Sequence, residues 1–211
     1  MRATDNRYAG ELDKFNLAIR MIGHEARTGT IRACTGFTED RIRKLYGTYF
    51  KTAGTDGIKR RRGKSPRQIG RFVNSTKRQT EATFLACLYL FCNVFQLNHQ
   101  NRPMRLSQLS EVELGERLCQ AFETYNKLYP NPQLSFEWAW NLYYALIETR
   151  ELYFAWCGNC TGPYIQDAYS LDYRRCPLCE LKDHRNEIIQ AGWHQPQHEL
   201  PVAARSKTRV P

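Results

Sequence analysis

Apolar positions recur with a helical period near the start of the chain. Between residues 12 and 26 they fall three or four positions apart, at Leu12, Phe15, Ile19, Ile22 and Ala26, which marks one face of an α-helix. Five such positions are too few to indicate a coiled coil, although the spacing would suit a partner helix. The pattern predicts an amphipathic helix that packs on its own domain or on a second protein, preceded by a flexible N-terminus over residues 1–11.

Residues 28–50 predict two helices joined by a tight turn. A short apolar segment ends at Cys34, and Gly36 can adopt the positive φ that a tight turn requires. Thr38 is suited to cap the second helix. The apolar face of that helix, which we expect to be buried, consists of Ile42, Leu45, Tyr46, Tyr49 and Phe50. This layout is typical of a helix-turn-helix unit, and a plain packing hairpin is the alternative.

The middle of the chain predicts three more helices. Residues 80–97 are apolar on almost every side, which predicts a central core helix or an oligomer contact. Ser110 and Glu113 form a capping-box pattern that begins the next helix, and Pro130 and Pro132 follow its end. An aromatic-rich helix is predicted from Ser135 through Arg150.

Positive charge is concentrated in one window. The chain has 211 residues and a formal net charge of +10. Residues 59–78 contain nine basic and no acidic side chains, so the other residues are together close to neutral: the nine are Lys59, Arg60, Arg61, Arg62, Lys64, Arg67, Arg71, Lys77 and Arg78. A patch of this kind indicates a polyanionic partner, which we take to be nucleic acid rather than an ordinary basic loop. Gly54, Gly57, Gly63 and Pro66 place the run in a loop, predicted over residues 52–78.

Four cysteines near the C-terminus have the spacing of a metal site. Cys157 and Cys160 form one C-x2-C pair, and Cys176 and Cys179 form a second after fifteen residues, which are enough for a short hairpin. Four thiolates at this spacing are typical of a zinc ribbon or knuckle, in which zinc is structural and has no open coordination position. The sequence therefore predicts one Zn²⁺ ion bound by Cys157, Cys160, Cys176 and Cys179.

Other function classes find little support. The composition is that of a globular protein, with 42% apolar and 25% charged residues. No apolar run is long enough to span a bilayer, and the N-terminus lacks the apolar segment of a secretory signal, so we expect a cytoplasmic protein with reduced thiols. The sequence contains no H-E-x-x-H, Walker A, G-x-S-x-G or G-x-G-x-x-G motif, and no enzyme is predicted.

These observations together predict a mainly α fold. Residues 12–150 would form a helical domain for DNA binding and oligomerisation, with the helix-turn-helix-like unit and the basic loop inside it. Residues 151–185 would form a small four-cysteine zinc-ribbon-like module, and residues 186–211 a disordered tail.

In this order of elements the chain resembles the FlhC family, the zinc-containing subunit of the bacterial flagellar master regulator. The resemblance covers roughly residues 12–185. It rests on the stretch from Leu17-Ala18-Ile19-Arg20-Met21-Ile22 through Arg41-Ile42-Arg43-Lys44-Leu45-Tyr46 and on Cys157-Gly158-Asn159-Cys160 with Cys176-Pro177-Leu178-Cys179. It implies a nucleoid-associated transcription activator that acts with an FlhD-like subunit, binds double-stranded promoter DNA and recruits RNA polymerase, with zinc on the four cysteines.

The Lys59–Lys64 run is more basic than the pattern of that family, which leaves open whether the target operons are flagellar or belong to conjugative transfer. A zinc-ribbon RNA-binding or scaffold protein is a further alternative, and a metal-dependent nuclease would need clustered carboxylates. The residues predicted to contact DNA are Arg41, Arg43, Lys44, Thr48, Lys59, Arg60, Arg61, Arg62 and Lys64.

Overall fold

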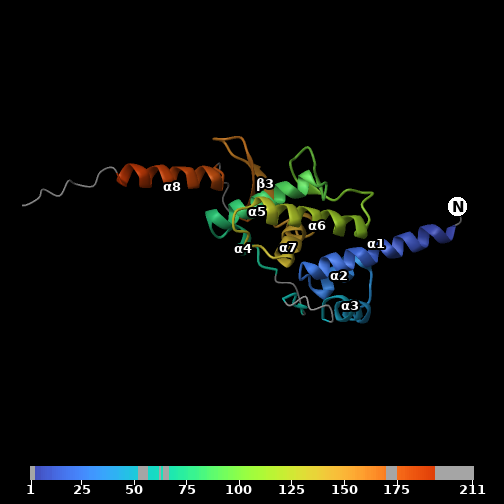
Figure 1. Ribbon diagram of the computed structural model, residues 1–211. Coiled ribbons are helices and arrows are strands. Elements are labelled where there is room, and N and C mark those ends of the chain that lie inside the picture. The colour runs from blue at the N-terminus through green and yellow to red at the C-terminus, as the bar shows by residue number, and fades with distance from the viewer. Residues whose placement is uncertain (1–2, 52–56, 62, 64–66, 170–174, 193–211) are drawn as a thin grey trace, which may run out of the picture.

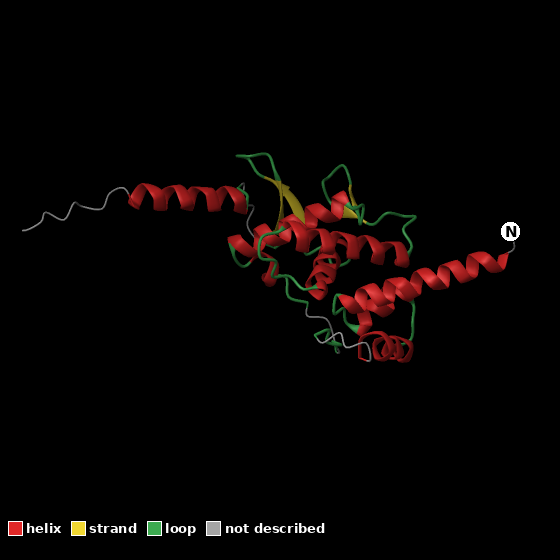
Figure 2. Cartoon of the chain, viewed as in Figure 1, coloured by secondary structure: helices red, strands yellow, loops and turns green. Residues whose placement is uncertain are grey.

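The computed structural model is mainly helical, with two small antiparallel hairpins (Figures 1 and 2). It describes residues 3–51, 57–61, 63, 67–169 and 175–192. The elements in chain order are α1 (Ala3–Gly23), α2 (Thr28–Thr35), α3 (Glu39–Tyr46), the π-helical turn η1 (Gly47–Lys51), α4 (Gly70–Val73), α5 (Thr76–Phe91), β1 (Gln96–Leu97), β2 (Pro103–Met104), α6 (Glu111–Leu128), α7 (Phe136–Ile147), β3 (Leu152–Trp156), β4 (Pro163–Asp167) and α8 (Pro177–Gly192).

Helix α1 begins earlier and ends earlier than the apolar stripe predicts. It begins at Ala3 rather than Leu12, so residues 3–11 are helical, and it ends at Gly23. Glu25 then takes a left-handed conformation with a φ of 57°, which turns the chain before Ala26. Among the side chains of α1 that the structure describes, from Tyr8 onward, the buried ones begin with Leu17. The first half of the helix extends away from the body of the molecule (Figure 1).

Helices α2 and α3 form the predicted pair around a glycine turn. Gly36 has a φ of 71°, and its backbone N–H closes α2 by donating to the carbonyl of Arg32. The Thr38 hydroxyl accepts the backbone N–H of Arg41 at 3.3 Å, as expected of an N-cap. The prediction that Tyr49 is buried is wrong, because this side chain is 45% exposed. The chain changes to π-helical geometry at Gly47, which shifts the register of the side chains that follow.

Helix α5 is the central core helix, and its boundaries differ from the prediction. It begins at Thr76 and ends at Phe91 rather than at residue 97. The backbone turns at Asn93, which has a φ of 53°, so Val94 and Phe95 enter the core without continuing the helix. The predicted loop over residues 52–78 also contains α4 and the first residues of α5.

Helices α6 and α7 complete the core against α5. The capping box at the start of α6 is present, because the side chains of Ser110 and Glu113 each accept the other's backbone N–H. Helix α7 covers Phe136–Ile147, within the predicted range, although the Ser135 side chain makes no cap hydrogen bond with the described residues. The Tyr89 hydroxyl of α5, fully buried, donates to the carbonyl of Ala139 at 2.6 Å and ties α5 to α7.

Gly115 of α6 marks a close approach of the first two helices. A Cβ added at this glycine would lie 2.6 Å from Leu17 Cδ2 and 3.0 Å from Cys34 Cβ. We expect Gly115→Ala to lower the free energy of unfolding by about 1–3 kcal/mol through overpacking. Gly10→Ala is the matched control, because nothing in the described part of the chain lies within 4 Å of its Cβ position. There the better helix propensity of Ala should leave stability unchanged or slightly raised. Denaturant unfolding of both variants tests the contrast.

The C-terminal hairpin differs from the prediction in its position. Its strands β3 and β4 lie on either side of the first cysteine pair, with Leu152 opposite Asp167 and Trp156 opposite Pro163, rather than between the two pairs. The hairpin packs on the helical body, because three of its side chains belong to the main core: Leu152, Phe154 and Ile165. Helix α8 continues to Gly192, through the first residues of the predicted tail, and residues 193–211 lie outside the described residues.

No helix among the described residues combines the length and the apolar character that a bilayer crossing requires.

Candidate metal centre and basic surface

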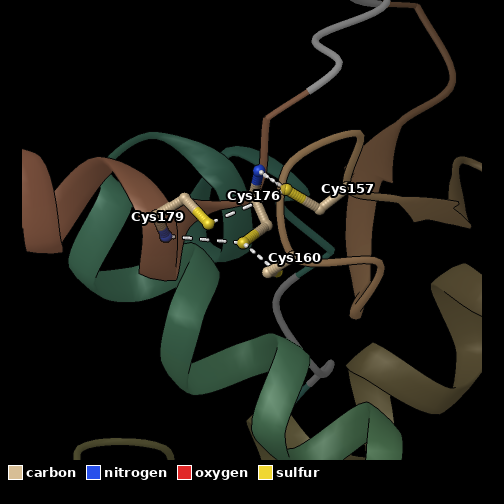
Figure 3. Close-up of side chains that lie close together, drawn as sticks. All are labelled: Cys157, Cys160, Cys176 and Cys179. Atoms are coloured by element: carbon tan, nitrogen blue, oxygen red, sulfur yellow. Dashed lines mark hydrogen bonds between the residues drawn. The ribbon is translucent and has the colours of Figure 1, made fainter.

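The two cysteine pairs converge on one point. Cys157 and Cys160 lie in the turn that follows β3, and Cys176 and Cys179 lie at the start of α8 (Figure 3). The four sulfur atoms are all within 4.8 Å of one another. Cys157 Sγ lies 3.8 Å from Cys179 Sγ, and Cys160 Sγ lies 3.6 Å from Cys176 Sγ. The predicted ligand set is therefore assembled by the fold.

These distances fit a tetrahedral metal site better than disulfides. A disulfide requires about 2.05 Å between sulfur atoms, and the four cysteines are free thiols. A tetrahedral ion with metal–sulfur bonds of about 2.3 Å places its sulfur ligands about 3.8 Å apart, close to the two spacings above. Four thiolates suit zinc and would fill its coordination shell, which makes the cluster a candidate structural site.

Backbone N–H groups point at the sulfur atoms. The N–H groups of Asn159 and Cys176 donate to Cys157 Sγ at 3.4 and 3.3 Å, and that of Cys179 donates to Cys176 Sγ at 3.4 Å. Hydrogen bonds from the backbone of Cys160, and then from Cys176 and Asn159, lower the pKa of Cys157 to about 6. The Asn159 side chain also donates to Cys179 Sγ at 3.5 Å, an outer contact that the cysteine spacing did not indicate.

Helix α5 supports the elements that carry the cysteines. Gln79 donates its side-chain amide to the carbonyl of Ile165 at 2.8 Å, and the Thr83 hydroxyl accepts the N–H of the same residue at 3.1 Å. The Thr76 hydroxyl donates to the carboxylate of Glu180 on α8 at 3.2 Å. One face of α5 thus binds both the hairpin and the helix that supply the cysteines.

The other four cysteines are structural thiols. Cys34 and Cys119 are fully buried in the main core, and Cys87 and Cys92 are half-buried against it. Burial raises the pKa of Cys34 to about 12, so this thiol stays protonated at neutral pH and is a poor nucleophile.

The predicted DNA-contact residues of α3 and η1 are partly engaged within the chain. Arg41 donates to the carboxylate of Glu11 at 3.0 Å, and its guanidinium lies 3.7 Å from the centre of the Phe37 ring. Arg43 pairs with Asp40 at 3.1 Å. Lys44 and Thr48 are exposed, and no ion pair of Lys44 occurs among the described residues.

We define the basic arm as residues 59–64, and its described residues 59–61 contact the corner between α1 and α2. The backbone N–H of Lys59 donates to Glu25 at 3.1 Å, and Arg61 pairs with the same carboxylate at 2.6 Å. Although burial raises the pKa of Glu25, these two contacts hold it below its usual value. Arg60 reaches the Thr28 hydroxyl at 3.4 Å. Two further predicted contact residues of the arm, Arg62 and Lys64, lie outside the described residues.

The second half of the basic window forms a separate site that the sequence prediction did not include. Arg67 and Arg71 lie over aromatic rings of α7, 4.5 Å from the centre of Tyr144 and 4.7 Å from that of Trp138. Arg71 also lines a cavity together with Lys77 and Arg78. The charge count of the window was the only sequence signal for this site, because the spacing of its residues follows no known motif.

No protein-family model and no curated protein matches the chain.

Proposed function

We propose that this protein binds double-stranded DNA and activates transcription as part of a hetero-oligomer with an FlhD-like subunit. The observation that carries the proposal is the segregation of charge. Nine basic and no acidic side chains lie within residues 59–78 of a chain that is otherwise close to neutral. Dense positive charge in one region is the electrostatic signature of a protein that neutralises backbone phosphates.

The α2–α3 pair supports duplex DNA as the polyanion. Two helices around a left-handed glycine, with Lys44 and Thr48 exposed after the turn, have the layout of a helix-turn-helix unit. The arm joins the same corner of the molecule through Glu25. We assign sequence preference to α3 and sequence-independent affinity to the arm, because a rigid helix can present side chains to base edges whereas dense charge contacts phosphates.

The aromatic rings near the basic residues favour duplex DNA over single-stranded RNA. Tyr144 and Trp138 are covered by guanidinium groups and are not presented as open platforms for base stacking, which single-stranded ligands use. An RNA-binding or scaffold role stays the second candidate, supported by the basic arm together with the four-cysteine cluster.

The cysteine cluster contributes stability rather than chemistry in this proposal. With zinc bound by Cys157, Cys160, Cys176 and Cys179, no position is left for a water molecule that could be activated. The zinc-ribbon-like hairpin and α8 would then be fixed to α5. The first half of α1 extends from the body with Tyr8 and Leu12 exposed, and we assign contact with the FlhD-like subunit to this segment.

A pair of variants with opposite expected effects tests the role of the arm. Replacing Arg60, Arg61 and Arg62 with Ala should weaken binding to promoter and scrambled duplexes alike. It should also flatten the dependence of log K on log salt by about 0.9 for each phosphate that is no longer neutralised. Glu25→Gln removes the carboxylate that neutralises Arg61, so it should strengthen non-specific binding.

A substitution in α3 tests its role in sequence preference. Lys44→Ala should reduce the difference in binding free energy between the promoter and scrambled duplexes by about 1–3 kcal/mol if Lys44 contacts a base.

These measurements use the chain co-expressed with a neighbouring FlhD-like protein and fluorescence anisotropy at several salt concentrations. The proposal fails if the triple arm variant keeps both the affinity and the salt slope of the wild type. If a single-stranded RNA of equal length competes more strongly than the duplex, the RNA-binding alternative replaces it.

A further inference from the structure

Helix α5 begins with two cations at the end where positive charge is least favourable. Ser75 caps the helix, and Lys77 and Arg78 follow in a first turn that contains no acidic residue of its own, although the carboxylate of Glu180 on α8 accepts the Thr76 hydroxyl of this turn. The exposed N–H groups of a helix N-terminus carry about half a positive charge, which favours a nearby anion and disfavours a cation. The local electrostatics therefore improve when an anion lies between these side chains.

The same two side chains open onto a cavity of about 280 Å³. Arg71 lines it from α4, and Asn131 and Gln133 line it from the segment between α6 and α7. Gln133 is fixed in place, because its side chain donates to Asn131 Oδ1 at 3.0 Å. The cavity thus combines space for a ligand with three cationic side chains from two elements.

Arg71 is held in position before any ligand binds. Its guanidinium lies over the Trp138 ring, and its buried Nε–H has no hydrogen-bond acceptor in the described part of the chain. A stacked guanidinium is a preorganised donor for phosphate, because it loses little side-chain freedom on binding.

The balance of charge in the cavity is positive. Of the described residues that line it, only Glu81 is acidic, and its buried carboxylate accepts hydrogen bonds from the Tyr125 hydroxyl and the Gln133 N–H. Among the described residues, no acidic side chain forms an ion pair with Arg71, Lys77 or Arg78. Three positive charges therefore face one negative charge that is already hydrogen-bonded.

We propose that the cavity lined by Arg71, Lys77 and Arg78 is a phosphate-binding site. The phosphate belongs either to the backbone of the bound nucleic acid or to a free phosphorylated small molecule. The first source rests on the proposed function and extends its contact surface beyond the arm and α3. The second source is independent of it.

Two variants and one control test the site. Lys77→Ala and Lys77→Ala/Arg78→Ala remove the exposed cations, and Lys127→Ala removes an exposed cation from the last turn of α6 as the matched control. The cavity variants should keep the wild-type melting temperature, because loss of a cation from a helix N-terminus does not weaken the helix. Each protein is titrated against a duplex at several salt concentrations and, separately, against inorganic phosphate by phosphorus NMR line width.

We expect the double variant to lose the broadening of the phosphate signal, to bind the duplex at least about tenfold more weakly and to show a salt slope lower by about 1.8, while Lys127→Ala behaves as wild type. If the double variant loses the broadening but binds the duplex as tightly as the wild type, the site is supported and its ligand is a free phosphorylated molecule. The same conclusion follows if the wild type binds no duplex and only the double variant loses the broadening. If neither titration distinguishes the double variant from Lys127→Ala, the inference is overturned.

Discussion

Replacing Cys157 with Ser should abolish stoichiometric zinc binding and release α8 from α5. A structural zinc site of four thiolates contributes on the order of 10 kcal/mol to the state that binds the metal, and Cys157 accepts two of the backbone N–H groups that orient the cluster. Elemental analysis of the purified protein should show about one zinc per chain in the wild type and almost none in the variant. Limited proteolysis should then cut the variant faster after residue 167.

The hairpin itself should survive this substitution in part. Leu152, Phe154 and Ile165 are anchored in the main core, whereas α8 carries two of the four cysteines and depends on the cluster for its position. Cys92→Ser is the matched control, since Cys92 is a half-buried thiol outside the cluster, and its zinc content should equal that of the wild type. A folded wild type without bound metal would contradict the assignment.

Replacing Glu81 with Ala should destabilise the helical body by about 1–3 kcal/mol, because the buried Tyr125 hydroxyl would be left without an acceptor. The partly buried N–H of Gln133 would lose its acceptor as well, but water in the cavity can reach it. Glu81 is 4% exposed. Its carboxylate accepts the Tyr125 hydroxyl and, at 2.6 Å, the backbone N–H of Gln133. For a chain of this size the loss corresponds to a fall in melting temperature of roughly 2–12 °C, which circular dichroism would measure.

Glu81→Gln separates the acceptor from the charge. The amide oxygen of Gln can still accept both hydrogen bonds, so this variant should recover most of the lost stability. If Glu81→Ala unfolds at the wild-type temperature, the network of Glu81, Tyr125 and Gln133 contributes nothing to folding. Burial, followed by the contact with Glu81, raises the pKa of Tyr125. The hydroxyl therefore stays protonated and remains a donor at neutral pH.

Local chemistry made much of the helical architecture predictable. The Ser110–Glu113 capping box, the Thr38 cap and the left-handed Gly36 all depend on residues within four positions of one another, and the structure confirms each. The convergence of the four cysteines was predictable for a similar reason, because each C-x2-C pair forms its own turn and the fold has only to bring two turns together.

The errors occur where tertiary contacts decide the outcome. Val94 and Phe95 have the apolar character of the helix before them, yet that helix ends at Phe91. The backbone then turns at Asn93, and both side chains enter the core from outside the helix. The position of the hairpin could not be predicted from the cysteine spacing. Strand β4 is held in place by hydrogen bonds from Ile165 to Gln79 and Thr83 of α5, which lie far from it in the sequence. Ion pairs such as Arg61 with Glu25 join residues far apart in sequence, and charge counting overlooks them.

Helix α5 contacts both the cysteine-bearing elements and the cavity, so binding at one of these sites bears on binding at the other. Thr76, Gln79 and Thr83 hold the cysteine-bearing elements, while Lys77, Arg78 and Glu81 line the cavity beside the same turns. Two ligands that each stabilise one helical segment are thermodynamically linked, and the factor by which the first raises the affinity of the second equals the factor by which the second raises that of the first. If the four cysteines bind zinc and the cavity binds phosphate as proposed, metal occupancy and anion affinity should be coupled through two turns of one helix.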